Sequence, residues 1–211
     1  MYDFLVDLDE YFCLNYANYD KLCVLPGYEM PMMQRSEVRE DGRTYAYTLP
    51  METMALSNQA NKKELLAVLK TRMTDTTFSF SFSTVGIFSR IKNLFSKYAP
   101  HKALNKYLEK YGISKQTALE ELSISEEVWD GICKGKFRPT KNLLYSLGLT
   151  AQFSYDDLKN LFLLCGYEVD MSVVKDVVMS YLFGQKVYNR GMINAALQEY
   201  KIANLFIKQE N

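Results

Sequence analysis

The sequence is short of most features that mark a specialised class of protein. Its 211 residues include 5 prolines, 10 glycines, 4 cysteines and 1 histidine, and Lys+Arg equal Asp+Glu at 25 each. So little proline and glycine excludes a collagen-like or linker-dominated chain. The zero net charge removes the basic excess that marks dedicated nucleic-acid-binding proteins. The rest of the composition, 48% hydrophobic and 14% aromatic, predicts a globular protein of one or two domains.

Few side chains are suited to metal binding or catalysis. The cysteines form no C-x-x-C pair and have no zinc-like spacing; they are Cys13, Cys23, Cys133 and Cys165. Structural zinc needs four convergent ligands, so we expect no metal and no cofactor, and free thiols in a reducing compartment. A cysteine nucleophile would need His101 as its base, and no local spacing supports that pairing. We therefore expect a non-enzymatic protein.

Long apolar runs are also missing. No window approaches the 18 uninterrupted apolar residues of a membrane span. The first ten residues are acidic where a signal peptide is basic. We expect a cytoplasmic protein with no membrane partner.

The neutral total hides an uneven distribution of charge. Residues 1–60 hold 10 acids and 4 bases, residues 61–100 hold 2 acids and 7 bases, and residues 101–211 hold 13 acids and 14 bases. An acidic head and a basic middle attract one another. We therefore expect the head to pack against the basic stretch at residues 84–98.

Residues 1–99 predict a small α+β segment of unknown role. Apolar residues at helical spacing predict a helix within residues 2–16. Two short β-leaning runs at residues 21–25 and 43–49, separated by turn-forming residues, predict a hairpin or an extended arm. A further helical stretch runs from Pro50 through Met73, in which Leu65, Leu66, Leu69 and Met73 form an apolar stripe.

Two patterns come just before Pro100, which marks the predicted domain boundary. Alternation at residues 77–83 places Phe78, Phe80 and Phe82 on one face of a strand. That strand either covers the core, which we favour, or offers an aromatic surface to a partner. Residues 84–98 then take a helical period with a basic side. We expect a core helix with a solvated basic face; the alternatives are a membrane surface or nucleic-acid phosphates.

Residues 100–211 predict an all-α domain. Helices are expected at residues 103–111, then from Ser114 to Leu122, from Ser125 to Lys134, and from Thr140 onward, each opened by a capping residue or closed by glycine. A further helix opens at Ser154 and ends at Gly166. Two short helices joined by a tight turn have the helix-turn-helix plan.

The residues of this plan resemble the phage-repressor/Cro-like helix-turn-helix family over residues 102–150. The matching positions are Leu122, Ile124, Ser125, Gly135, Lys136, Pro139, Thr140 and Leu147. The continuation to about residue 208 is similar to a C-terminal extension of bacterial helix-turn-helix-like proteins of unassigned role. Its marks are Leu164, Gly166, Tyr167, Asp176, Tyr181, Tyr188, Ile193, Asn194 and Leu197. The fold class is therefore expected to be mainly α, a helix-turn-helix-like domain preceded by the α+β segment.

The resemblance implies where DNA would bind. The recognition helix would carry Ser125, Glu126, Glu127 and Asp130 into or near the major groove. Phosphates would be held by the cations around its exit, which are Lys134, Lys136, Arg138 and Lys141. The leading expectation is thus a bacterial DNA-binding or regulatory protein, with double-stranded DNA as partner.

The acids on this helix depart from what DNA requires. Glu126, Glu127 and Asp130 would meet the repulsion of the phosphates, whereas acids in a first helical turn stabilise the helix itself. The alternative is a protein-interaction or self-association module, with a protein partner or a homodimer, that has lost DNA binding. Two interpretations also exist for the roles of Trp129, Tyr167, Asp176 and Asn194. Trp129 is a core anchor or a surface contact, and the other three fix helix ends, which we favour, or form a functional polar set.

Overall fold

The computed structural model describes residues 4–17, 34–38, 42–48, 62–74, 81–202 and 205–207. These residues form ten helices and a two-stranded sheet, which confirms a mainly helical protein. The strands are β1 (Gln34–Val38) and β2 (Thr44–Thr48). The helices are α1 (Phe4–Asn15), α3 (Lys62–Arg72), α4 (Ile87–Phe95), α5 (Pro100–Lys110), α6 (Lys115–Glu121), α7 (Glu126–Cys133), α8 (Lys141–Thr150), α9 (Tyr155–Cys165), α10 (Val174–Gly184) and α11 (Arg190–Glu199).

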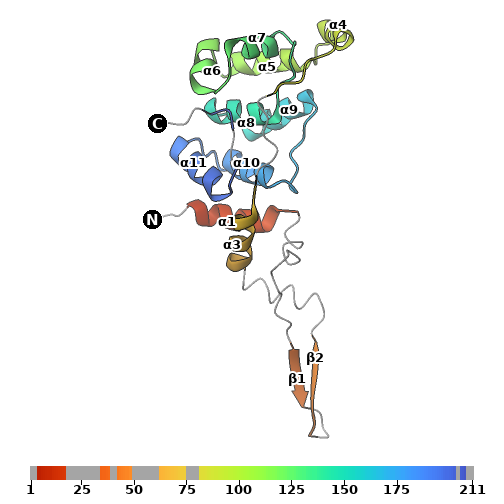
Figure 1. The fold of residues 1–211 in the computed structure, drawn as a ribbon, viewed down its shortest axis with the longest axis vertical. Helices are drawn as coiled ribbons and strands as arrows, with labels where there is room; N and C mark the ends of the chain where they lie inside the picture. Colours follow the sequence, from red (N-terminus) through yellow and green to blue (C-terminus); the bar gives the residue numbers. More distant parts are fainter. Residues whose placement is uncertain are drawn as a thin grey trace.

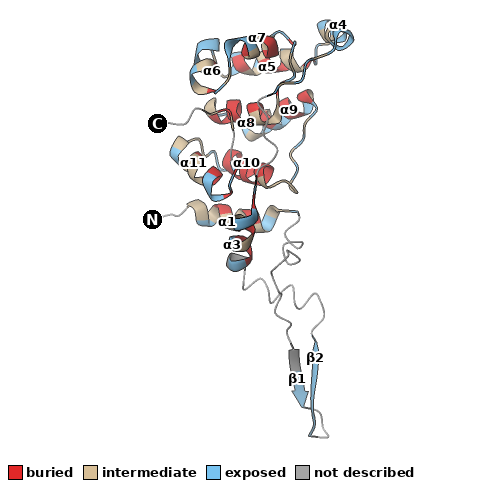
Figure 2. Ribbon diagram, in the orientation of Figure 1, coloured by how far each residue is buried: buried red, intermediate tan, exposed pale blue. Residues whose placement is uncertain are grey.

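The helices are stacked along one long axis (Figure 1). α5 packs on α7 and α9, α9 on α8 and α10, and α10 on α11 and α1, with α3 against α1. Buried residues, red in Figure 2, occur in every layer of the stack, and the buried hydrophobic residues form one cluster that runs from Leu8 in α1 to Leu104 in α5. α1 therefore shares a core with helices that follow Pro100 in the chain.

The predicted helix starts in the C-terminal half are confirmed. The side-chain oxygens of Ser114, Ser125, Thr140 and Ser154 each accept a hydrogen bond from the backbone N–H three residues further on, at 3.0, 3.4, 3.2 and 3.2 Å. Each such cap stabilises its helix by about 1 kcal/mol. Gly135 follows α7 with a φ of +70°, a left-handed conformation that side chains with a Cβ rarely adopt. These local signals place α6, α7, α8 and α9 at the expected positions.

The predicted helices of the N-terminal part are also confirmed where they fall on described residues. α1 lies within residues 2–16 and buries Leu8 and Phe12. α3 lies within the stretch that ends at Met73. The predicted stripe is buried, with Leu65, Leu66 and Leu69 in α3 and Met73 directly after it.

The strand predicted at residues 43–49 is confirmed as β2, but its partner differs from the expected one. β2 pairs antiparallel with β1, with Gln34 opposite Thr48 and Val38 opposite Thr44. Residues 21–25 lie outside the described residues. The sequence of β1, Gln-Arg-Ser-Glu-Val, has no apolar alternation. Residues 36–38 and 42–48 of the hairpin are all exposed, so no face of that part needs to be apolar.

The orientation of α4 corrects the expectation of a core helix. Its large apolar side chains face solvent, with Phe88 and Phe95 each 86% exposed. Arg90, Asn93 and Ser96, which follow one another at helical spacing, are the half-buried positions. The apolar side of α4 therefore points outward and its polar side faces the body of the protein. The spacing of residues 84–98 indicates that the helix has two faces and carries no information on which one turns inward.

Of the phenylalanine-rich run at residues 77–83, only residues 81–83 belong to the described part of the chain. Phe78 and Phe80 lie outside the described residues, and residues 81–83 are not part of a strand. Phe82 is half-buried, and its ring lies 5.6 Å from that of Phe206. This contact agrees with a covering role for Phe82, while the strand itself remains a prediction.

The expected packing of the acidic head on residues 84–98 is wrong for the described residues. α1 and α4 lie at different levels of the stack (Figure 1). Asp9 of α1 instead accepts hydrogen bonds from Lys70 Nζ at 2.6 Å and from the Tyr200 hydroxyl at 2.7 Å. The countercharge of Asp9 is therefore Lys70 of α3. This helix belongs to the basic stretch of residues 61–100 but precedes residues 84–98.

The described cysteines are free thiols. Cys165 is buried, Cys13 and Cys133 are half-buried, and Cys23 lies outside the described residues. Burial raises the pKa of Cys133 to about 11 and that of Cys165 to about 12. Both thiols are therefore protonated at neutral pH and are poor nucleophiles.

Candidate functional site

The unit formed by α6 and α7 is anchored by apolar side chains. Leu122 in the connecting turn and Trp129 and Ile132 in α7 are buried, with Trp129 only 3% exposed. Trp129 is therefore a core anchor. The ring of Phe137 covers the outer side of Gly131, where an added Cβ would lie 2.3 Å from the Phe137 Cδ2 atom. These contacts hold α7 and the segment after it as one unit.

The acids of the predicted recognition helix form ion pairs within the unit. Lys115 Nζ lies 2.5 Å from Glu126 Oε1 and 2.7 Å from Asp130 Oδ1. Lys134 Nζ lies 3.1 Å from Asp130 Oδ2, one helical turn away. Glu127 is exposed, and the Ser125 hydroxyl is occupied as the cap of α7. The exposed side of α7 therefore carries three carboxylates. Glu126 and Asp130 are paired with lysines, and Glu127 is not part of these pairs.

The position of Lys115 makes a testable prediction about Asp130. Hydrogen bonds from Lys115 and then from Lys134 hold the pKa of the Asp130 carboxyl below its usual value. Replacing Lys115 by Gln removes the first of these cations, so we expect the pKa of Asp130 to rise toward the usual value. An NMR titration of the carboxyl carbons measures the change. Lys106→Gln, an exposed lysine on α5, is the control, and equal pKa values in both variants would contradict the assignment.

Three of the four predicted phosphate-binding cations have partners inside the protein. Lys134 is paired with Asp130, and Lys141 is paired with the buried carboxylate of Asp176. The Arg138 guanidinium donates to the carbonyl of Cys165 at 2.6 Å. Lys136 is exposed, and no described acid forms an ion pair with it. The structure thus leaves Lys134, Lys136 and Arg138 exposed, with Arg138 engaged at the end of α9, and turns the half-buried Lys141 toward α10.

The place of Arg138 depends on the end of α9. Gly166 has a φ of +74°, and a Cβ added there would lie 2.8 Å from the Arg138 Nη2 atom. The guanidinium also stacks on the ring of Tyr167, with 4.8 Å between its Cζ atom and the ring centroid. Arg138 therefore binds the last carbonyl groups of a helix, where a cation is favoured by the helix dipole.

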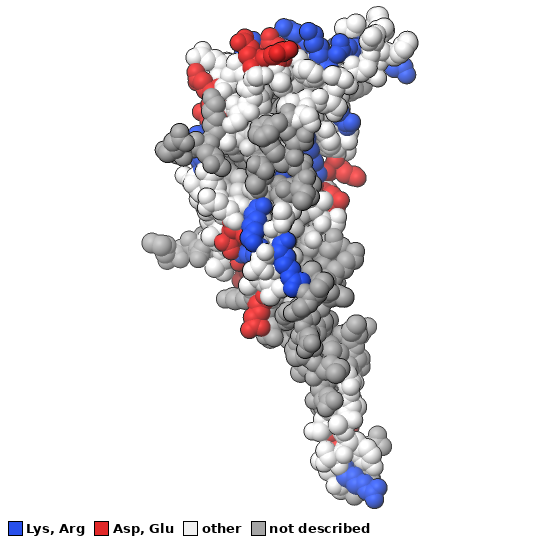
Figure 3. All heavy atoms as spheres, in the orientation of Figure 1, with Lys and Arg blue, Asp and Glu red and all other residues white. Residues whose placement is uncertain are grey.

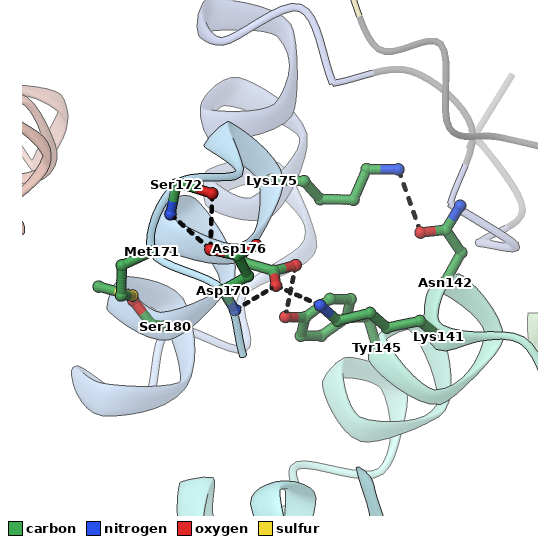
Figure 4. A network of polar contacts seen from close by, with 9 residues as sticks. All are labelled: Lys141, Asn142, Tyr145, Asp170, Met171, Ser172, Lys175, Asp176 and Ser180. Carbon is green, nitrogen blue, oxygen red and sulfur yellow. Dashed lines mark hydrogen bonds and ion pairs between the residues drawn. The ribbon is translucent and has the colours of Figure 1, made fainter. Parts of the chain in front are cut away.

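A buried carboxylate network fixes the start of α8 (Figure 4). Asp176 is 2% exposed and accepts hydrogen bonds from the Lys141 ammonium, from the Tyr145 hydroxyl at 3.0 Å and from the Asp170 N–H at 2.7 Å. Burial, and then the charge of Asp176, raises the pKa of Tyr145 well above its usual value. The network joins α8 to the segment that leads into α10.

Two of the three polar residues singled out in the predicted extension, Tyr167 and Asp176, have structural partners. The Tyr167 hydroxyl donates to the carbonyl of Pro139 at 3.1 Å, just before α8. Together with Asp176, Tyr167 fixes a helix start, in agreement with the favoured interpretation. Asn194 is half-buried on α11. Sequence reasoning missed Lys115 as the partner of Glu126 and Asp130, although a lysine directly after the Ser114 cap lies where it can reach the next helix.

Among the residues that the structure describes, no cluster of three or more His, Cys, Asp or Glu side chains is arranged to hold a metal ion. In that same part of the chain, no helix combines the length and the apolar character needed to cross a bilayer.

Comparisons with known proteins add no family to this picture. No protein-family model matches the chain, and searches of curated proteins and of solved structures find no match. The resemblance to phage-repressor/Cro-like proteins therefore stays a prediction from the sequence.

Proposed function

We propose that the chain is a non-enzymatic protein-interaction or self-association module, built on a helix-turn-helix-like unit that does not bind duplex DNA. The observation that carries this proposal is the internal use of the cations expected to hold phosphates. Lys134 is engaged by Asp130, Arg138 by the end of α9, and Lys141 by Asp176. Releasing Lys141 to DNA would leave the buried Asp176 carboxylate without its countercharge, which costs more than a surface contact to a phosphate returns. Releasing Arg138 would remove its hydrogen bond to the last carbonyl of α9.

The acids of α7 support the same proposal. Glu126 is 69% exposed at the side chain, and Glu127 lies beside it at the N-terminal turn. On DNA these groups would approach the phosphates at the place where the resembled family makes its contacts. A protein surface with basic or polar groups imposes no such repulsion, so the exposed side of α7 suits a protein partner or a second copy of this chain.

The proposal makes a prediction about DNA. We expect no measurable binding of the full chain to random duplex DNA at low salt, measured by fluorescence anisotropy. The reason is that, at the four positions where the resembled family would hold phosphates, Lys134 and Lys141 are paired with acids and Arg138 with helix carbonyls. Only the Lys136 side chain has no partner among the described residues, and a single phosphate contact gives very weak non-specific affinity.

A matched variant separates this proposal from DNA binding. Lys136→Gln should leave the anisotropy unchanged, as should Lys186→Gln in the exposed α10–α11 connection. Affinity that falls linearly with the logarithm of salt concentration, and that weakens in the Lys136 variant alone, would overturn the proposal in favour of a DNA-binding protein.

The interaction itself is tested with a photo-crosslinking residue in place of Glu127, with the same residue at position 186 as the control. Adducts to protein, or to a second copy, that form from position 127 and not from position 186 are the expected result. Adducts to DNA from position 127, or equal yields from both positions, would contradict the proposal.

A further inference from the structure

The outward apolar face of α4 is an unusual surface for a small globular protein. Its members are Ile87, Phe88, Ile91, Leu94 and Phe95, followed by Tyr98, and their exposures range from 49% to 86%. With successive residues 100° apart, the five helical positions fall within an arc of about 120°. Contiguous exposed apolar surface of this kind marks a binding site. Leaving it in water would cost more than turning it inward, so its orientation requires contacts that hold it.

Such contacts are present at both ends of the helix. Before α4, Val85 N–H donates to the carbonyl of Lys136 at 2.8 Å, and Arg138 N–H donates to the carbonyl of Ser83 at 3.0 Å. After it, Lys102 Nζ donates to the carbonyls of Leu94 at 2.8 Å and Ser96 at 3.1 Å. These bonds tie the flanking backbone of α4 to α5 and to the segment after α7.

Arg90 fixes the rotation of the helix between these ends. Its Nη2 atom donates to the carbonyl of Lys136 at 3.3 Å, and the side chain is half-buried. Arg90 therefore points to the body of the protein, and the apolar arc on the other side of α4 points away from it. The helix is held with this face presented.

The charge around the face identifies what it fits. The sequence from Thr76 to Leu108 contains no acid, and its cations are Arg90, Lys92, Lys97, Lys102 and Lys106. Lys92 and Lys97 are exposed, on α4 and just after it. In Figure 3, blue side chains lie beside α4, while the red carboxylates at that end of the molecule gather over α7. Apolar side chains bordered by lysines are complementary to a layer with an apolar interior and an anionic outer boundary.

We infer that α4 docks on an anionic lipid bilayer, lying in the interface with its apolar face among the acyl chains and its lysines at the headgroups. This inference departs from the expectation of no membrane partner, which rested on the lack of a spanning segment and not on surface binding. This inference is independent of what α7 binds. α4 projects from the stack at one end of the molecule (Figure 1).

A second copy of this chain is the poorer occupant. The nine residues of α4 form a strip about 13 Å long and about 10 Å wide, whereas each partner in a stable protein complex buries about 800 Å². Pairing two such helices would also bring like charges together. Membrane binding needs no such area, because each lysine near an anionic surface adds to the affinity gained from apolar insertion.

Co-sedimentation of the full chain with lipid vesicles tests the inference. We expect binding to vesicles made of equal parts phosphatidylcholine and phosphatidylglycerol, and much weaker binding to phosphatidylcholine alone. Phe88→Ser with Phe95→Ser should reduce the affinity at least about a hundredfold, because two inserted aromatic side chains are lost. Leu14→Ser with Leu163→Ser is the matched control, since these leucines are 76% and 68% exposed on α1 and α9.

The charge component is tested separately. Lys92→Gln should weaken binding to the anionic vesicles about fivefold, and Lys186→Gln should leave it unchanged. All substituted positions are exposed, so the variants are expected to keep the fold, which circular dichroism verifies.

Two results would overturn the inference. The first is a failed binding test: the chain binds both kinds of vesicle equally or neither of them, or the phenylalanine variant binds as the leucine control does. The other is a dimer in sedimentation equilibrium that the phenylalanine variant converts to a monomer, which would assign the face to self-association instead.

Discussion

Replacing Asp176 by Ala is expected to lower the free energy of unfolding by about 3 kcal/mol or more, as for other broken buried ion pairs. The Asp176 carboxylate is 2% exposed and accepts hydrogen bonds from Lys141, Tyr145 and the Asp170 N–H. Without it, the buried Tyr145 hydroxyl and the Asp170 N–H lose their acceptor. The Lys141 ammonium, 24% exposed at the side chain, also loses its countercharge. Urea denaturation followed by circular dichroism measures the loss.

The matched control is Asp156→Ala. Asp156 also forms an ion pair, with Lys159 at 2.9 Å, but its side chain is 85% exposed. An exposed pair three residues apart on a helix contributes at most about 0.5 kcal/mol. In a Lys141→Met background, Asp176→Ala should cost less than in the native chain, because the two residues are coupled. Similar losses for the two aspartate variants would show that the network of Figure 4 does not stabilise the fold.

Replacing Trp129 by Ala is expected to destabilise the protein by about 3–5 kcal/mol, the range for deleting a large buried aromatic side chain. Trp129 is 3% exposed and belongs to the same core cluster as Leu104 and Leu122. The indole joins α7 to that cluster, so its loss should loosen the α6–α7 unit first. Hydrogen exchange of the α7 amides, together with urea denaturation, measures both effects.

Two variants on the same helix serve as controls. Trp129→Phe keeps an aromatic ring and should cost clearly less than Trp129→Ala. Glu127→Ala changes the exposed neighbour and should alter the stability by about 0.5 kcal/mol or less. A stable Trp129→Ala variant would mean that α7 is not anchored through its tryptophan and that the side chain is available for partners.

Much of the helical framework could be predicted because its signals are local. Ser114, Ser125, Thr140 and Ser154 each bond an N–H three residues away, so both partners are visible in one short stretch of sequence. Gly135 and Gly166 follow helices for an equally local reason, the positive φ that ends them. The apolar stripe of α3 could also be predicted from the helical spacing of its leucines, and its burial is confirmed.

The candidate site was predicted less well, because its charges depend on distant parts of the chain. Lys141 and Asp176 lie 35 positions apart, and Arg138 and Cys165 lie 27 positions apart. A cation near the end of a predicted recognition helix looks available for phosphates until the fold brings an acceptor to it. For the same reason, the acids of α7 can be recognised in the sequence, but their pairing with Lys115 cannot.

The sequence by itself determined the helical class, the starts of the capped helices α6, α7, α8 and α9, and the two-sided character of residues 84–98. Tertiary structure decided which side of that last helix meets water and which cations are free. Helix formation and capping depend on bonds between residues three or four apart, whereas the rotation of α4 depends on the contact of Arg90 with the carbonyl of Lys136, 46 positions away. An amphipathic pattern specifies two faces, and only contacts from the rest of the chain select the one that turns outward.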